Sequence, residues 1–172
     1  MQTAAQEFIR AVRLLPPNLR TEVLNLPDNI TNGAEEIRLR AGSSPTIVLP
    51  DGEVEILPLH KIAASELQLV LEIATRASAH TYADSIRMGF VTADGGCRLG
   101  LCGTAVTDEN RITSLRRLSS LCIRIPREKR GCADGVYSAL TNGGFKSTIL
   151  VSPPGTGKTT LLRELIRLLS DS

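Results

Sequence analysis

The sequence predicts an antiparallel α+β domain over residues 1–142, followed by the beginning of an α/β domain over residues 143–172. Three observations lead to this division. Alternating apolar and polar residues, typical of strands, occur in two groups, and within each group a hairpin signal separates neighbouring strands. Stretches with helical spacing separate these groups. The last residues change to an all-apolar run, a loop with glycines and an amphipathic run, which is the strand, loop and helix order of an α/β domain.

The composition is that of a globular protein without a strong charge. The chain has 172 residues, 22% of them charged, and a net charge of +2, which is enough length for one domain and a piece of another. No stretch approaches the roughly 20 apolar residues of a membrane span. Three Phe, two Tyr and no Trp offer few surfaces on which bases could stack, so we expect no nucleic-acid partner.

Helices and a small meander are expected first. Apolar residues at helical spacing predict helices over residues 4–14 and 18–25, separated by a Pro-Pro pair. In "EEIRLRA", Ile37 and Leu39 alternate with arginines, which predicts a half-buried strand. "PTIVLP" and "EVEIL" flank an Asp-Gly pair, a strong signal for a tight hairpin turn. We therefore expect an antiparallel meander over residues 35–57.

A second group of helices and strands follows. Ser65 is a suitable N-cap for a helix whose apolar face begins at Leu67. "YADSIRMG" predicts a short helix that Gly89 ends. "GFVTADGGCRLGLCGTAV" predicts two strands around an Asp-Gly-Gly turn, and "SLCIRIP" predicts a third. A last helix is expected from Asp134, and the Asn-Gly-Gly at 142–144 is the expected domain boundary.

The cysteines do not indicate a metal site. Cys97, Cys102, Cys122 and Cys132 show no C-x-x-C spacing, and the two histidines lie elsewhere in the chain. The first residues form a mixed-charge helical pattern without the apolar core of a signal peptide. We therefore expect reduced cysteines in a cytoplasmic protein.

The end of the chain carries a phosphate-binding motif. Residues 152–159 match the Walker A pattern of Gly, four residues, Gly, Lys and Ser or Thr, except that Ser152 stands in the first Gly position. "TILVS" predicts a strand buried on both faces of a parallel sheet. "KTTLLRELIRLLS" predicts a helix with Leu161, Leu165 and Leu168 on one side. This setting argues against a chance match.

Each residue type in the loop suits a bound nucleotide. Main-chain N–H groups at the start of a helix can converge on phosphate oxygens, and glycine permits the close approach. Lys158 is the predicted catalytic residue, with its charge on the β- and γ-phosphates of ATP, and the Thr159 hydroxyl is expected to bind Mg²⁺. The predicted cofactor-binding residues are Ser152, Pro153, Pro154, Gly155, Thr156, Gly157, Lys158, Thr159 and Thr160.

The chain also resembles the stage III sporulation protein AA family, which consists of ATPases related to the motors of type II and type IV secretion. The resemblance covers nearly the whole chain and is carried by "EEIRLRAGSSPTIV", "SLCIRIPREKRGCADGVY" and "SPPGTGKTTLLREL". It implies an α+β domain on a RecA-like P-loop NTPase core, in a ring of subunits expected to be a hexamer. It also implies a place in the mother-cell cytoplasm, with membrane proteins of the feeding channel to the forespore as partners.

Hydrolysis needs more than the phosphate loop, because a Walker B acid, a group that orients water and commonly an arginine take part. Twelve residues follow Thr160 and fit within one helix, so we expect weak Mg-nucleotide binding and no turnover by this chain alone. Residues 146–172 are expected to dock on the first domain, to be held by a partner chain or to be marginally ordered. Whether the chain is a fragment, a deliberately shortened protein or a truncated gene product stays open.

Residues 98–130 are locally basic, with eight Arg or Lys against three acids. One interpretation is a solvated surface. The other is that Arg116, Arg117 and Arg124 reach a phosphate bound by a neighbouring subunit and sense it.

Three functions remain open from the sequence. The first is an ATP-binding motor subunit. The second is a non-catalytic oligomerisation or interaction module in which the phosphate loop is idle. The third is a nucleic-acid-linked ATPase, against which the scarce aromatics and small net charge count. The sequence does not decide between ATP and GTP, the size of the oligomer or the identity of the partner.

Overall fold

The computed structural model describes residues 4–78, 80–109, 111–126, 131–143, 147–153 and 156–171. The chain divides into two compact units, Met1–Arg127 and Glu128–Ser172. Helix α6 (Asp134–Thr141) belongs to the second unit because it contacts helix α7 (Lys158–Ser170). The boundary predicted at residue 143 is that of an NTPase domain. The division into compact units does not test it, so it stays a prediction.

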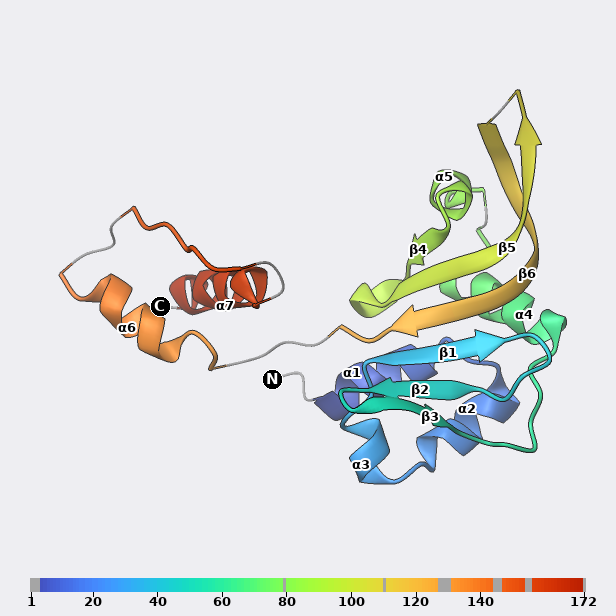
Figure 1. Ribbon diagram of the computed structural model, residues 1–172, viewed down its shortest axis with the longest axis horizontal. Coiled ribbons are helices and arrows are strands. Elements are labelled where there is room, and N and C mark those ends of the chain that lie inside the picture. Colours follow the sequence, from blue (N-terminus) through green and yellow to red (C-terminus); the bar gives the residue numbers. More distant parts are fainter. Residues whose placement is uncertain are drawn as a thin grey trace. The chain divides into compact units, whose positions relative to one another are not determined.

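The described part of the first unit alternates groups of helices and strands in the predicted order (Figure 1). Its helices are α1 (Ala4–Val12), α2 (Pro17–Leu24), α3 (Asp28–Thr31), α4 (Ala64–Ala74) and α5 (Ala83–Arg87), with a 3-10 turn η1 (Asp94–Gly96). Its strands are β1 (Glu36–Arg40), β2 (Thr46–Leu49), β3 (Gly52–Glu55), β4 (Phe90–Thr92), β5 (Arg98–Asp108) and β6 (Arg111–Arg124). The short helix α3 has no counterpart among the expected elements.

All strands belong to one antiparallel sheet in the order β3-β2-β1-β6-β5-β4. The expected meander β1-β2-β3 is confirmed, and so is the group β4-β5-β6. The two groups are joined by β1 and β6, where Ile37 faces Ile123 and Leu39 faces Leu121. An antiparallel sheet with helices is the α+β arrangement that the alternating patterns predicted.

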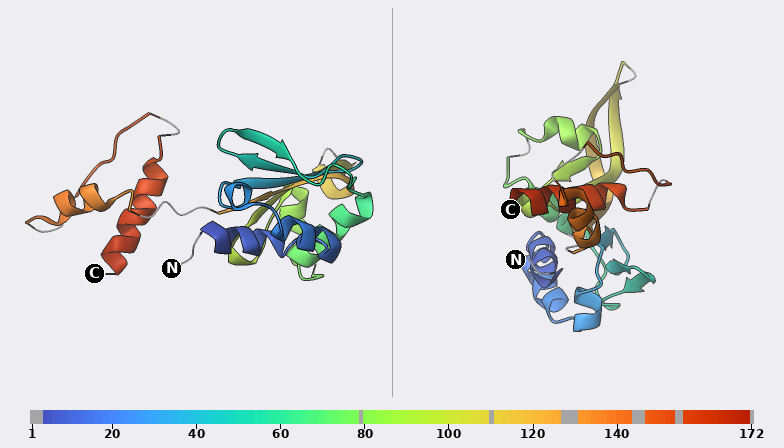
Figure 2. Two further views of the ribbon diagram at one scale, coloured as in Figure 1. Left: turned by 90° about the horizontal axis from the view of Figure 1, so that it is seen from below. Right: turned by 90° about the vertical axis from the view of Figure 1, so that its left-hand side faces the viewer.

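The core lies on one face of this sheet, which the helices cover (Figure 2). Along β1 buried and half-buried residues alternate, so every second residue points toward the helices, as the pleat of a β-strand requires. The buried strand residues are Ile37, Leu39, Ile47, Val91, Leu99, Leu118, Leu121 and Ile123. Helix residues at the predicted spacing complete the core, among them Phe8, Val12, Leu19, Val23, Leu67 and Val70.

The start of helix α4 differs from the expectation. Ser65 is not the N-cap, because the helix begins at Ala64. The Ala63 N–H donates instead to Oε2 of Glu66 at 2.9 Å, so a carboxylate in the first turn caps the helix from within. Burial would raise the pKa of Glu66, but bonds from the Ala63 amide and from the side chains of His60 and Asn18 outweigh it and lower the pKa.

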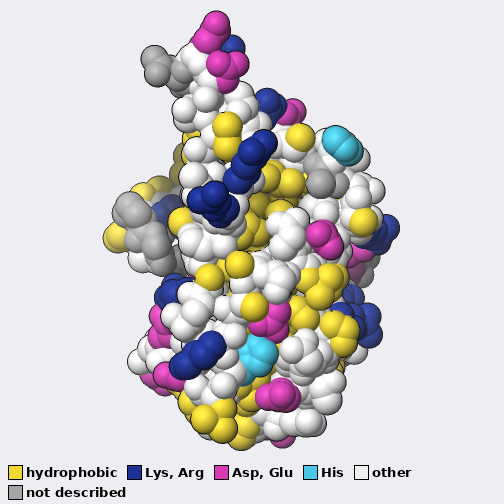
Figure 3. Space-filling model, turned by 90° about the vertical axis from the view of Figure 1, so that its right-hand side faces the viewer, with side chains coloured by type: hydrophobic (Ala, Val, Ile, Leu, Met, Phe, Trp, Pro, Cys, Tyr) yellow, Lys and Arg dark blue, Asp and Glu magenta, His cyan; other side chains and the backbone are white. Residues whose placement is uncertain are grey.

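Strand β6 is longer than the predicted strand, which began at Ser120. The segment "RITSLRRLS" does not alternate cleanly, and it becomes a strand because β5 pairs with it. Pairing with β4 ends at Gly100 and pairing with β1 ends at Ser120. The rest of β5 and β6 therefore forms a two-stranded ribbon beyond the sheet (Figure 1), with charged side chains of both signs at its tip (Figure 3).

The second unit confirms two predicted helices, α6 from Asp134 and α7, and corrects a predicted strand. Helix α7 has the predicted limits. The buried strand expected for "TILVS" is absent: residues 147–153 form no strand, and Ile149 and Val151 are 86% and 88% exposed. The described residues of this unit include no other strand that could pair with the segment, and a strand without a neighbour has no ladder to stabilise it.

Candidate nucleotide-binding site

The start of helix α7 provides amide groups without helical partners. Gly157 lies directly before the helix with φ 90° and ψ 15°, a left-handed conformation that glycine adopts without steric cost. The Leu161 N–H donates to the Gly157 carbonyl at 2.9 Å. The amides of Lys158, Thr159 and Thr160 therefore belong to the first turn, where a helix supplies no acceptors and carries a positive partial charge. Such amides suit an anion.

The Lys158 side chain lies back over the loop. Its Nζ donates to the carbonyl oxygens of Ser152 and Pro153 at 2.7 and 2.8 Å. An ammonium has three donors, so these bonds leave one for another acceptor. Because the two carbonyls are neutral, a phosphate would compete well for the ammonium through charge-assisted hydrogen bonds.

Ser152 uses its hydroxyl to tie the loop together. The Thr156 Oγ1 donates to the Pro153 carbonyl at 2.8 Å and lies 2.6 Å from the Ser152 Oγ. Since the single hydroxyl proton of Thr156 points to Pro153, Ser152 must donate to Thr156. The serine that replaces the expected glycine therefore helps to shape the loop.

The remaining predicted residues are placed less completely. Pro154 and Gly155 lie outside the described residues. Thr159 is exposed in the first turn of α7, and Thr160 lines a cavity beside the loop. Over the described ranges, no group of three or more His, Cys, Asp or Glu side chains could hold a metal ion. The Thr159 hydroxyl, the predicted ligand of Mg²⁺, would be a single protein oxygen, which suits a metal that shares its coordination with phosphates.

The cavity beside the loop has a volume of about 650 Å³, a size typical of ligand sites. Its polar lining comes from the loop and the first turn of α7, namely Ser152, Thr156, Lys158 and Thr160. Its apolar lining comes from Cys132, Leu150, Val151 and Leu161. Cys132 lies outside the motif, and no sequence signal placed it here.

A buried carboxylate was also missed by the sequence analysis. Glu164 on α7 is only 6% exposed. Its Oε1 accepts the Gly131 N–H at 2.8 Å, and its two oxygens accept Nη2 and Nε of Arg167, each at 2.8 Å. Arg167 also pairs with Asp171 at 2.8 Å. The bond to Glu164 is the main reason why the pKa of Arg167 is raised.

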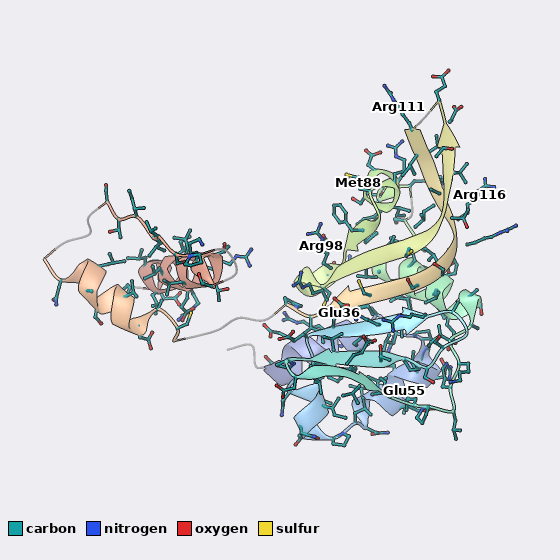
Figure 4. All side chains as sticks on the ribbon, viewed as in Figure 1. Glu36, Glu55, Met88, Arg98, Arg111 and Arg116 are labelled. Carbon is teal, nitrogen blue, oxygen red and sulfur yellow. The ribbon has the colours of Figure 1, made fainter. Side chains whose placement is uncertain are left out.

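Described arginines of the basic segment lie at separate places along the β5–β6 ribbon and the sheet. Figure 4 shows Arg98, Arg111 and Arg116 well apart along β5 and β6. Arg98 stacks on Phe90, with its guanidinium carbon 4.3 Å from the ring centre. The candidate phosphate sensors Arg116, Arg117 and Arg124 are exposed. Arg127, Lys129 and Arg130 lie outside the described residues, so phosphate sensing stays a prediction.

The face of the sheet opposite the core carries a neutralised charge cluster. Arg38 pairs with Glu36 at 2.5 Å and with Glu53 at 2.6 Å, and Arg40 pairs with Glu53 at 2.9 Å. Bonds from Arg40 and then from Thr46 lower the pKa of Glu53 to about 2. Because acids and bases balance, this cluster is a structural feature of the sheet surface.

A family profile described as "Sporulation stage III, protein AA" matches residues 6–172. The chain belongs to this family. "Stage III sporulation protein AA" of Bacillus subtilis (strain 168) is 32% identical over 157 residues, which are 91% of this chain and 50% of that protein. The chain therefore spans about half the length of the curated relative that it matches.

Three solved structures resemble the chain at low identity. The Legionella pneumophila ATPase DotB aligns with a TM-score of 0.44 and 16% identity, over 81% of this chain and 39% of DotB. The pilus retraction motor PilT with bound ADP aligns with a TM-score of 0.48 and 19% identity, over 80% of this chain and 39% of PilT. The VirB11 ATPase of Brucella suis in complex with sulphate aligns with a TM-score of 0.43 and 15% identity, over 98% of this chain and 45% of VirB11. Within the described ranges, no helix has the length and apolar character needed to cross a membrane.

Proposed function

We propose that this chain is part of an ATP-binding motor subunit of a sporulation secretion or feeding-channel complex. The observation that carries the proposal is the position of the Lys158 ammonium, which bonds two carbonyls of the loop beside the first-turn amides of α7. A cation and several amide donors at the start of one helix suit a polyphosphate. Membership of the sporulation family supports the cellular role.

The residues of the loop divide the work of binding. Lys158 would exchange its bonds to the loop carbonyls for bonds to the β- and γ-phosphates, and the amides of 158–160 would receive other phosphate oxygens. The Thr159 hydroxyl would hold Mg²⁺, which neutralises charge on the phosphates when bound. Gly157 lets the backbone turn closely under the ligand.

Turnover needs groups that we place outside residues 1–172, in a RecA-like P-loop NTPase core and in neighbouring subunits of a ring, expected to be a hexamer. A Walker B acid and a water-orienting group are the missing parts. We place the ring in the mother-cell cytoplasm, against membrane proteins of the channel. Hydrolysis by the complete protein, but not by this chain, is the expected outcome.

A second candidate is a non-catalytic interaction module with an idle phosphate loop. It is favoured by Ile149 and Val151, which are 86% and 88% exposed just before the loop. An exposed apolar segment of this kind can add to a sheet of another chain. In that case the bonds of Lys158 to the carbonyls would be permanent.

Titration with fluorescent ATP in the presence of Mg²⁺ tests the first candidate. Lys158→Ala should weaken binding by at least about tenfold, because it removes a charge-assisted bond to phosphate. Lys61→Ala is the matched control, since Lys61 bonds the Ser44 hydroxyl in the first unit and should leave the affinity unchanged. Identical curves for the unaltered chain and Lys158→Ala would favour the interaction module.

A further inference from the structure

The second unit buries a carboxylate where it buries little else. Among its described residues, the other buried side chains are Ala133 and Leu165, which are 0% and 4% exposed. Placing an ionised carboxylate away from water is costly unless it is paired and hydrogen-bonded. Glu164 therefore differs from the charged residues of an ordinary amphipathic helix, which lie on the exposed face.

The partners of Glu164 come from two directions. Arg167 binds both carboxylate oxygens from the next turn of the same helix. A Glu–Arg pair of this spacing also forms on exposed helix surfaces, so it does not account for the burial. The Gly131 N–H, 33 residues away in sequence, supplies a further bond at 2.8 Å. Glu164 thus ties the phosphate-loop helix to the start of the second unit.

This bond holds the residue that directly precedes Cys132. Gly131 is held by Glu164, and Ala133 is fully buried at the start of α6. The residue between them is exposed at the cavity beside the phosphate loop. Glu164 follows Thr160, another lining residue, by one helical turn, so the two lie on the same side of α7.

We propose that Glu164 is a positioning residue: by holding Gly131, it keeps Cys132 in the wall of the nucleotide cavity. The inference rests on the proposed function. The polar side chains of the lining would meet the phosphates, and Cys132 with Leu150, Val151 and Leu161 would meet the nucleoside part of the ligand. Binding and wall position are then linked: nucleotide stabilises the wall, and displacing the wall weakens binding.

The linkage gives the site a means of regulation. In sequence, residues 131–133 follow Glu128, the first residue of the second unit, by three to five positions. Nucleotide affinity therefore depends on a contact outside the Walker A motif.

Variants of α7 separate this role from general helix stability. Glu164→Ala removes the acceptor of the Gly131 amide, and Glu164→Gln keeps an oxygen of the same reach without the charge. Asp171→Asn is the control, because Asp171 pairs with the same Arg167 but is 66% exposed. We expect amide exchange at Gly131 to rise at least about tenfold in Glu164→Ala, less in Glu164→Gln and not in Asp171→Asn.

Nucleotide binding is read in the same proteins. Glu164→Ala should weaken ATP about tenfold, and Asp171→Asn should leave it unchanged. MgATP should slow alkylation of Cys132 and leave Cys102, an exposed cysteine of the first unit, unaffected. This protection should disappear in Glu164→Ala, whereas a purely structural Glu164 would change helix content without changing which cysteine the nucleotide protects.

The outcomes distinguish the two proposals. If ATP binding depends on Lys158 but is equal in the unaltered chain and Glu164→Ala, the positioning role of Glu164 is overturned and the proposed function stands. Unchanged amide exchange at Gly131 in Glu164→Ala also overturns the positioning role of Glu164, because the bond would then not restrain Gly131. If no binding depends on Lys158, both proposals fail. Should Glu164→Ala lose its helix by circular dichroism, Glu164→Gln decides by the same measurements.

Discussion

The two units of this chain are stabilised in different ways. The first unit closes a six-stranded sheet with helices over a continuous apolar core. The second unit, over its described residues, buries Ala133 and Leu165 around the Glu164 contact and leaves Ile149, Val151 and Ile166 exposed. Burial of apolar surface is the main source of folding free energy. The first unit therefore has the means to fold by itself, whereas the second depends on local bonds and on what covers its apolar segment.

Hydrogen exchange should show the largest difference between the units. Amides of β1 and β6 pair in the middle of the sheet, so their protection should approach the full free energy of unfolding, about 5–15 kcal/mol. The Val151 amide should exchange almost freely, and the Leu161 amide, which bonds Gly157, should be intermediate. Strong protection at Val151 in a dilute monomer would show that the segment is covered within the chain.

Truncation of a core residue should have the next largest effect. Leu39 is fully buried, so Leu39→Ala should lower the free energy of unfolding of the first unit by about 2–5 kcal/mol in urea denaturation. Leu165→Ala should leave this transition within about 0.5 kcal/mol while it reduces the helix signal of the second unit. Leu162→Ala, at a position that is 48% exposed, is the control. One shared transition for all variants would contradict independent units.

A glycine tests whether the β5–β6 ribbon shares the rigidity of the sheet. A Cβ on Gly103 would lie 2.8 Å from the Arg116 carbonyl oxygen, beside the irregular pairing after Cys102. Gly103→Ala must move backbone and should cost about 1–3 kcal/mol in thermal unfolding. At Gly100 the obstacle is the Cys122 sulfur at 2.7 Å, which a rotation can move, so Gly100→Ala should cost less. Equal stability of Gly103→Ala and the unaltered chain would indicate a ribbon that yields like a loop.

The smallest effect is expected from acid. The pKa of Glu53 is lowered from its ordinary 4.5 to about 2, chiefly by Arg40 and Thr46, so its contribution is full above pH 4.5 and is lost as the pH falls toward 2. Because Glu53 is on the surface, the contribution should stay below about 1 kcal/mol. Glu53→Gln should make the free energy of unfolding of the first unit less dependent on pH between these values, and Glu55→Gln should leave that dependence unchanged. Parallel pH curves for Glu53→Gln and the unaltered chain would exclude this role.

Local patterns were sufficient for much of the fold and for the motif. The alternation around Ile37 and Leu39 predicted β1, and the Asp-Gly pair predicted the β2–β3 hairpin. Both features act between neighbours in sequence, so the residues alone specify them. The limits of α7 followed from the Gly-Lys-Thr sequence for the same reason. Nucleotide binding at this loop stays a prediction.

Other features depended on partners far away in the chain. The sequence by itself determined which face of each strand is apolar and where a phosphate loop could form, because side-chain spacing and glycine conformation are local properties. Only the tertiary structure decided that β6 begins at Arg111 and that "TILVS" is not a strand, since hydrogen-bond ladders need a neighbouring chain segment. It also brought Glu164 to Gly131 and Cys132 to the cavity, because contacts between residues distant in sequence follow from packing.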